Sequence, residues 1–185
     1  MNYLIESRKD LFDYIESDNS FAKEKGRQRI MKRVHDTEYY IDKYLVYLRK
    51  QEYYINTAGS NIIKKILCLY YERKKHNLGN KLGFYIGPNC FDKGLTIYHH
   101  GSIIVNPIAK IGENCKLHGN NCIGNSGLTE TCPMIGNNVD IGFGAVIIGD
   151  VQIADNIKIG ANAVVNKSFL DPGITIAGVP ARKVK

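Results

Sequence analysis

The spacing of apolar residues divides the chain into two parts. Within residues 1–83, apolar side chains recur at helical intervals. In the segment DTEYYIDKYLVYLRKQEYYIN, Tyr40, Tyr44, Tyr47 and Leu48 fall on one face of a helix. The segment SNIIKKILCLYYERKKHNLG repeats this pattern, which predicts a second helix whose apolar face carries Ile62, Ile63, Ile66, Leu67 and Tyr70.

Capping signals mark the ends of the second predicted helix. Ser60 or Asn61 is suited to begin it, and Gly79 is suited to end it. An earlier short helix is expected over residues 3–17. The first 83 residues therefore predict an α-helical N-terminal region.

After Leu82 the pattern changes to a period of six residues. Two series of aliphatic residues follow it, twelve positions apart and therefore in phase: Val105, Ile111, Leu117 and Ile123, then Ile135, Ile141, Ile147, Ile153, Ile159 and Val165. Four positions after these aliphatics comes a second set of small or branched residues: Ala109, Cys115, Val139, Ala145, Val151, Ile157 and Ala163.

A period of six matches neither a helix nor an alternating strand. It is typical of a coil with flat sides made of short strands, in which each side turns one aliphatic inward and glycine or asparagine occupies the corner. Three sides take eighteen residues, so residues 84–166 supply about four to five turns. The side faces of such a coil invite partners, and its three-sided shape favours a threefold assembly.

Composition adds a basic N-terminal half. The net charge is +7, and residues 1–83 hold 17 Lys+Arg against 11 Asp+Glu, whereas residues 84–185 hold 8 against 7. A positive field suits an anionic substrate, an anionic cofactor, a membrane surface or nucleic acid. Nucleic acid is disfavoured, because the aromatic residues follow helical core spacing instead of lying between basic residues on an exposed sheet.

The sequence also bears on the compartment. No apolar run approaches the roughly 20 residues needed to span a bilayer, and the N-terminus lacks a basic start followed by an apolar stretch. The five cysteines form no CxxC pair, which favours reduced thiols. We therefore expect a cytoplasmic protein.

The six-residue period, the segment IGFGAVIIGDVQIADNIKIGANAVVNKSF and the ending GITIAGVPARKVK resemble the hexapeptide-repeat acyltransferases, in particular the serine acetyltransferase branch and its shorter relatives from polysaccharide clusters. The resemblance is good over residues 84–185 and loose over 1–83. It implies a mainly β, left-handed parallel β-helix over residues 84–178 with a tail over 179–185. It also implies a homotrimer whose active sites lie between protomers, acetyl-CoA as cosubstrate and no metal.

The resemblance assigns the catalytic base to His99, in GLTIYHHGSIIV. A histidine is a suitable base for this step, because its ordinary pKa of roughly 6.5 lets it accept a hydroxyl proton near neutral pH. The donor would bind along small-residue corners near the base, with cations near the C-terminus for its phosphates. The implied donor-binding residues are Asn125, Ser126, Phe143, Ala161, Lys167, Arg182 and Lys183.

Three departures from the family pattern concern the candidate site. Tyr85 stands where the family has the aspartate that partners the catalytic histidine. Tyr98 stands where it has an aspartate that contacts the amino acid, and Thr131-Cys132-Pro133 replaces an Arg-His-Pro segment that contacts the carboxylate of serine. A charged amino acid thus loses its expected partners, and an unpaired buried charge is costly. The departures favour a sugar hydroxyl on a surface-polysaccharide precursor, membrane-adjacent or diphosphate-linked, with serine as the alternative acceptor.

Other residues compete for roles in the acceptor site. Asp92 is the carboxylate nearest to His99 in sequence, and His100 is a second candidate beside the base. His118, in KLHGNNCIG, is expected to contact the acceptor. A zinc site resembling that of β-helix carbonic anhydrases is disfavoured, because His99 and His100 are adjacent and diverge in a strand. A non-catalytic scaffold or acetyl-CoA sensor remains an alternative.

Overall fold

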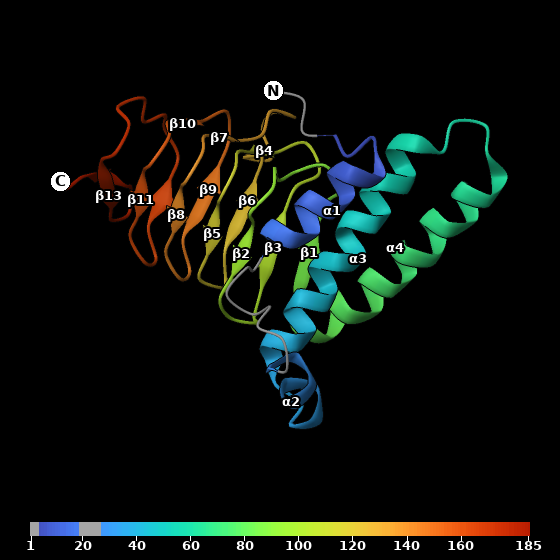
Figure 1. Ribbon diagram of the computed structural model, residues 1–185. Helices are drawn as coiled ribbons and strands as arrows, with labels where there is room; N and C mark the ends of the chain where they lie inside the picture. The colour runs from blue at the N-terminus through green and yellow to red at the C-terminus, as the bar shows by residue number, and fades with distance from the viewer. Residues whose placement is uncertain (1–3, 19–26) are drawn as a thin grey trace.

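The computed structural model describes residues 4–18 and 27–185, and it places a layer of helices beside a coil of short strands (Figure 1). Within these ranges the helices are α1 (Arg8–Ser17), α2 (Arg27–Arg33), α3 (Thr37–Thr57) and α4 (Ile62–Leu82). Helix α4 leads directly into the first strand of the coil. The predicted order, a helical segment followed by a mainly β coil, is confirmed. The sequence did not predict α2.

The strands form the three faces of a β-helix, and each face is a sheet of parallel strands. Face 1 contains β1 (Phe84–Ile86), β3 (Ile103–Val105), β6 (Cys122–Gly124), β9 (Val146–Ile148) and β12 (Val164–Val165). Face 2 contains β4 (Lys110–Ile111), β7 (Met134–Ile135) and β10 (Gln152–Ile153). Face 3 contains β2 (Thr96–Ile97), β5 (Lys116–Leu117), β8 (Asp140–Ile141), β11 (Lys158–Ile159) and β13 (Thr175–Ala177), with β14 (Arg182–Lys183) antiparallel at its end.

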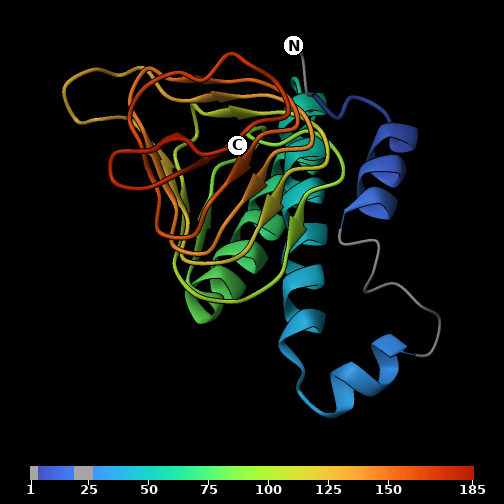
Figure 2. The ribbon, with the colours of Figure 1, turned by 90° about the vertical axis from the view of Figure 1, so that its left-hand side faces the viewer.

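The register between turns follows the sequence period. Val105 pairs with Ile123, eighteen positions on, whereas Ile123 pairs with Ile147, twenty-four positions on. The extra six residues fall in the loop of residues 125–133, which projects from the coil when the molecule is viewed along its length (Figure 2). The strands on either side of the loop therefore keep their phase.

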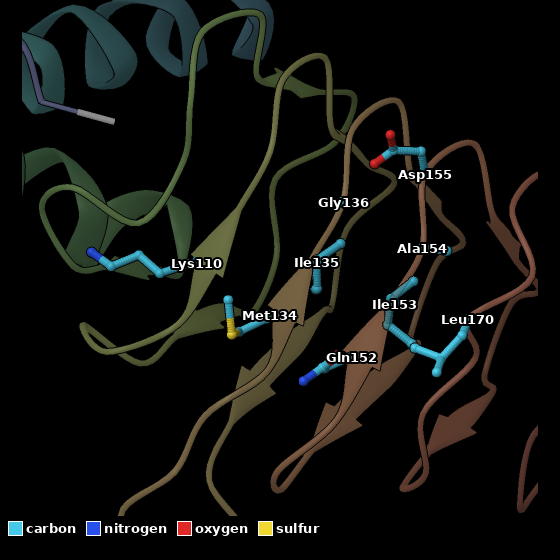
Figure 3. Close-up of a pocket in the computed structure, with 9 residues that line it drawn as sticks. All are labelled: Lys110, Met134, Ile135, Gly136, Gln152, Ile153, Ala154, Asp155 and Leu170. Carbon is cyan, nitrogen blue, oxygen red and sulfur yellow. The ribbon is translucent and has the colours of Figure 1, made fainter. Parts of the chain in front are cut away.

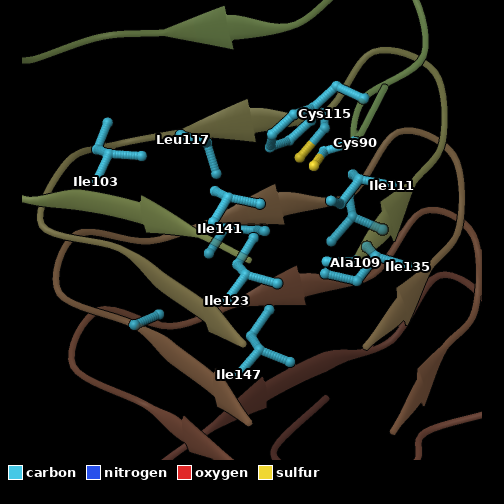
Figure 4. Close-up of a cluster of buried hydrophobic side chains, with 14 of the residues drawn as sticks. Cys90, Ile103, Ala109, Ile111, Cys115, Leu117, Ile123, Ile135, Ile141 and Ile147 are labelled. Atoms are coloured by element: carbon cyan, nitrogen blue, oxygen red, sulfur yellow. The ribbon is translucent and has the colours of Figure 1, made fainter. Parts of the chain in front are cut away.

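The repeat aliphatics fill the interior of the coil. All ten residues of the two six-residue series are at most 4% exposed, and the seven residues of the second set are at most 2% exposed. Side chains from neighbouring turns stack on one another, such as Ile123 on Ile147 (Figure 4). Fully burying one such side chain contributes about 1.5–3 kcal/mol.

Asparagines make many of the corners, as the pattern predicted. Asn114, Asn138 and Asn156 adopt positive φ, where asparagine is tolerated better than most residues. Their side chains form a ladder, in which Asn114 Nδ2 donates to Asn138 Oδ1 (3.1 Å) and Asn138 Nδ2 donates to Asn156 Oδ1 (3.2 Å). The corner residues thus also bind successive turns to one another.

A buried arginine joins the helices to the first turn of the coil. Arg49, in α3, is 0% exposed, and its guanidinium donates to Asp18 and Glu52. It also donates to the backbone carbonyls of Phe91 and Asp92 at 2.8 and 2.9 Å. Burial acts to lower the pKa of Arg49, but the two carboxylates outweigh burial and raise it. The guanidinium is therefore charged and fully used as a donor.

Helix α4 buries a different face from the predicted one. Ile62, Ile63 and Ile66 are 59–67% exposed, and Tyr70 is half exposed, whereas Lys75, Gly79 and Leu82 are buried. Lys75 satisfies its ammonium by donating to the carbonyl of Ile86 (3.0 Å). The prediction was wrong because the packing side is chosen by the contact with α3 and β1, not by the apolar stripe of α4.

The ends of α4 also refine the prediction. Asn61 caps the start, since its side chain accepts from Lys64 N–H, while Ser60 does not. The helix continues through Gly79 and ends at Gly83, which adopts the left-handed conformation with φ of 83°. Gly79 is needed for packing instead, because a Cβ there would lie 2.6 Å from the carbonyl oxygen of Phe84.

We expect Arg49→Met to lower the free energy of unfolding by about 3–5 kcal/mol, because it leaves two buried carboxylates without their partner. Urea unfolding followed by circular dichroism measures the change. Arg73→Met, on the exposed side of α4, serves as the control and should shift stability by less than about 0.5 kcal/mol. Equal stabilities for the two variants would contradict this role of Arg49.

Candidate active site

His99 lies at the edge where face 3 turns into face 1. We call this edge the histidine edge; successive turns of the coil contribute residues 98–102, 118–121, 142–145 and 160–163 to it. His99 and His100 are both exposed. The turn that carries them is fixed by its backbone, because Tyr98 N–H donates to Leu117 O (3.0 Å) and Gly101 N–H donates to Leu82 O (2.9 Å). The second bond connects this turn to the end of α4.

A second imidazole lies on the neighbouring turn. The side chain of His118 is 39% exposed, and its Nε2 lies 2.8 Å from Asp140 Oδ1 in β8. The ring of Tyr98 packs on it, with centroids 4.7 Å apart and planes tilted by 38°. Tyr98, His118 and Asp140 thus connect three successive turns on the outer side of face 3.

Asp140 was not among the site residues predicted from the sequence. It precedes Ile141, so the repeat phase alone places its side chain on the outer side of face 3, diagonal to His118 across the paired strands β5 and β8. The six-residue insertion in the loop of residues 125–133 hides this relation, because the usual interval of eighteen becomes twenty-four. Counting the insertion would have brought the two residues together.

Gly119 brings His99 and Phe143 to the same place. A Cβ on Gly119 would lie 3.5 Å from His99 Cβ and 3.1 Å from the Phe143 ring. Phe143 is 44% exposed, and its carbonyl accepts from Asn162 N–H (2.8 Å), next to the exposed Ala161. The histidine edge therefore carries the predicted base together with two of the predicted donor-binding residues.

The remaining donor-binding candidates lie elsewhere on the protomer. Asn125, Ser126 and Lys167 follow β6 and β12, at the edge between face 1 and face 2. Arg182 and Lys183 lie in β14, and the ammonium of Lys183 is 3.5 Å from Asp171 on the surface. A single protomer thus divides the predicted donor site between two edges.

Two acceptor candidates lie away from His99. Asp92 sits at the edge between face 2 and face 3, where its carboxylate accepts from the hydroxyl of Tyr14 (2.6 Å). It holds α1 against the coil, so it is not the partner of His99 in the protomer. Tyr85 points outward from face 1, 59% exposed, at a pocket that Lys75 and His76 of α4 also line.

A groove of about 290 Å³ lies on the outer side of face 2. Met134 and Gln152 extend from the adjacent strands β7 and β10 into it, and Leu170 closes one end (Figure 3). This groove belongs to a different face from the histidine edge. Among residues 4–18 and 27–185 there is no group of three His, Cys, Asp or Glu side chains arranged to hold a metal ion.

The helices and the cysteines bear on membrane crossing and on thiol chemistry. In the part of the chain that the structure describes, none of the helices combines the length and apolar character needed to cross a bilayer. The five cysteines, all within that part, are free thiols; Cys90, Cys115 and Cys132 are buried. Burial raises the pKa of Cys90 to about 12, so this thiol is protonated at neutral pH.

The curated relatives that match the chain are serine acetyltransferases. That of Synechococcus elongatus is 30% identical over 94 residues, covering 50% of this chain and 38% of the relative. Those of Mycobacterium tuberculosis and Helicobacter pylori are 31% identical over 104 residues and 33% identical over 94 residues. The chain matches only 38–54% of the length of these three relatives. No protein-family model matches it.

Solved structures extend the likeness to the helical half. Soybean serine acetyltransferase aligns with a TM-score of 0.71 and 23% identity, covering 95% of this chain and 69% of the other. The Neisseria gonorrhoeae enzyme aligns with a TM-score of 0.67 and 24% identity, covering 96% and 68%. These matches show the fold, a left-handed hexapeptide-repeat β-helix with N-terminal helices, and the resemblance inferred from the sequence is confirmed.

We expect Gly119→Ala to disturb the histidine edge. Its φ of 115° disfavours any side chain, and the new Cβ would crowd the Phe143 ring at 3.1 Å while contacting His99 at an ordinary 3.5 Å. The loss of stability should be about 1–3 kcal/mol, measured by thermal unfolding. Gly127→Ala is the control, because it has φ of 77° and nothing within 4 Å. Equal losses in the two variants would show that crowding at the edge contributes nothing.

Proposed function

We propose that this chain, which is similar to serine acetyltransferases, is an acetyl-CoA-dependent O-acetyltransferase with His99 as general base. His99 takes the proton of an acceptor hydroxyl while the hydroxyl oxygen attacks the thioester carbonyl carbon. The tetrahedral intermediate then expels the CoA thiolate, which receives the proton from the imidazolium. The observation that carries the proposal is the position of His99 on an open edge of a β-helix whose matched relatives are acetyltransferases.

L-serine is the first acceptor to test. The sequence departures favoured a polysaccharide sugar, but the matched relatives are named serine acetyltransferases, which supports the alternative acceptor better. A sugar hydroxyl stays the second candidate on one specific observation. Tyr85, Tyr98 and Thr131 supply no charge, and Cys132 is buried in the loop, so none of these four substituted positions offers an ionic contact.

The division of donor-binding candidates supports a site shared between protomers. Phe143 and Ala161 lie beside His99, whereas Asn125, Ser126 and Lys167 lie on the next edge of the coil. One acetyl-CoA meets both groups only if the histidine edge of one protomer faces the second edge of another. Exposed apolar side chains on the coil, including Ile104, Ile108 and Met134, are suited to be covered in such an assembly.

The first test measures acetyl transfer. Purified protein is incubated with acetyl-CoA and either L-serine or a nucleotide-linked sugar, and released thiol is followed together with product mass. His99→Ala should reduce kcat by about 10²–10⁴-fold, because it removes the base. His76→Ala, an exposed histidine on α4, should leave the rate unchanged. Equal rates for wild type and His99→Ala would favour a scaffold or sensor instead.

The second test measures assembly. Light scattering coupled to gel filtration should give three times the chain mass of 20.8 kDa. Mixing denatured and refolded His99→Ala and Ser126→Trp chains should restore part of the activity that each lacks alone, because some sites then combine two intact edges. A monomer, or no restoration in a mixed trimer, would contradict a shared site.

A further inference from the structure

His118 and Asp140 form a hydrogen-bonded pair near the candidate base. Within residues 4–18 and 27–185, it is the one contact between a histidine ring and a carboxylate within 4 Å. His99 lies one turn away and is exposed. The edge thus carries two imidazoles, and the one held by a carboxylate is His118, not His99, which the resemblance assigns as the base.

The hydrogen bond to Asp140 sets the tautomer of neutral His118. An ionised carboxylate only accepts hydrogen bonds, so the Nε2 atom that lies 2.8 Å from it must carry a proton. The other ring nitrogen, Nδ1, then presents a lone pair. Tyr98 packs against the ring and limits its rotation. His118 therefore offers a fixed hydrogen-bond acceptor beside the histidine edge.

Gly119 relates the hydrogen-bond acceptor of His118 to His99. Gly119 follows His118 directly, and the place where a Cβ on Gly119 would lie is close to both His99 and the ring of Phe143. Tyr98, which packs on His118, precedes His99 directly. His99 and His118 thus lie on adjacent turns, each directly next to a residue that approaches the other.

We propose that His118 is an acceptor-binding residue, whose Nδ1 accepts a hydrogen bond from a donor group adjacent to the hydroxyl that is acetylated, and that Asp140 is its positioning residue. This rests on the proposed function only in taking His99 as the place of the reacting hydroxyl. It assigns the acceptor class: molecules that carry an N–H or O–H donor next to the reactive hydroxyl.

Two sources supply such a donor. L-serine has an ammonium beside its hydroxymethyl group, and a sugar has a neighbouring hydroxyl. The carboxylate of Asp140 favours the ammonium, although Lys116 and Lys158 lie opposite Asp140 in the two adjacent strands and offset part of its charge. The acceptors compared in the test therefore decide between the two sources.

The experiment compares two substitutions of the same histidine. His118→Gln places an amide near the former Nε2 and removes the group at Nδ1, whereas His118→Asn places an amide near the former Nδ1. We expect His118→Gln to raise KM for the acceptor at least about tenfold, equivalent to about 1.4 kcal/mol, with kcat and KM for acetyl-CoA nearly unchanged. His118→Asn should raise the acceptor KM less. Asp140→Asn should act in the same direction as His118→Gln.

Matched controls separate binding from folding. Asp13→Asn and His76→Gln change exposed residues of the same types on helices α1 and α4 and should leave both KM values unchanged. Thermal unfolding of each variant checks that the fold is intact. Calorimetric binding of the acceptor in a His99→Ala background provides a readout that needs no turnover, so a failed acetyl-transfer assay counts against the proposed function alone.

The acceptor series identifies the donor group. If His118 binds the ammonium, 3-hydroxypropanoate, which is serine without its amino group, should bind wild type as weakly as serine binds His118→Gln. The two losses should then not add. If His118→Gln weakens the binding of the sugar but leaves the binding of serine unchanged, the donor group is a sugar hydroxyl. An acceptor KM and affinity unchanged in His118→Gln, or a loss confined to kcat, would overturn the proposal.

Discussion

The inward stacking of one aliphatic side chain every six residues is the constraint on which the molecule depends. Each face contributes only one or two buried apolar residues per turn, so no turn has a core of its own, and each is stable only because the next turn covers it. Positive-φ corners such as Asn138 and Asn156 let the chain turn without disturbing that phase. The consequence for function is that residues at equal offsets from the aliphatics align along an edge. His99, Gly119, Phe143 and Ala161 are neighbours for this reason.

The helices solve a problem that the coil creates. A parallel β-helix exposes unpaired backbone groups at its first turn, and these need partners. Arg49 donates hydrogen bonds to the carbonyls of Phe91 and Asp92, and Lys75 donates to that of Ile86. The carbonyl of Leu82 accepts a hydrogen bond from Gly101 N–H. The last contact belongs to the turn that carries His99. The helical layer therefore both closes the coil and fixes the backbone of the candidate base.

The sequence predicted the buried positions of the coil, which the six-residue period controls. It failed to predict side-chain partners and the buried face of α4, which tertiary contacts decide. The buried positions from Val105 to Val165 follow from spacing alone, because a phase error would expose every later aliphatic. The buried face of α4 does not follow, since Lys75 reaches a carbonyl that only the folded β1 provides. Asp92 was a candidate partner of His99 because it is close in sequence. In the structure, the hydroxyl of Tyr14, far away in sequence, donates a hydrogen bond to the Asp92 carboxylate instead. The position of Asp140 beside His118 could have been predicted from the period by counting the six-residue insertion before Met134.

The residues proposed to bind the acceptor are separate from the residues that hold the fold. Outward residues such as Tyr98, His118 and Asp140 take no part in the stacked interior, so replacing them leaves the aliphatic rows intact. Positions 85 and 98 carry tyrosines, and the carboxylate of Asp140 in β8 reaches the edge through its contact with His118. This carboxylate thus comes from a later turn and contacts the edge through an imidazole. In the proposed role of His118, this arrangement keeps the backbone geometry of the candidate base and alters only which neighbouring group of the acceptor is recognised.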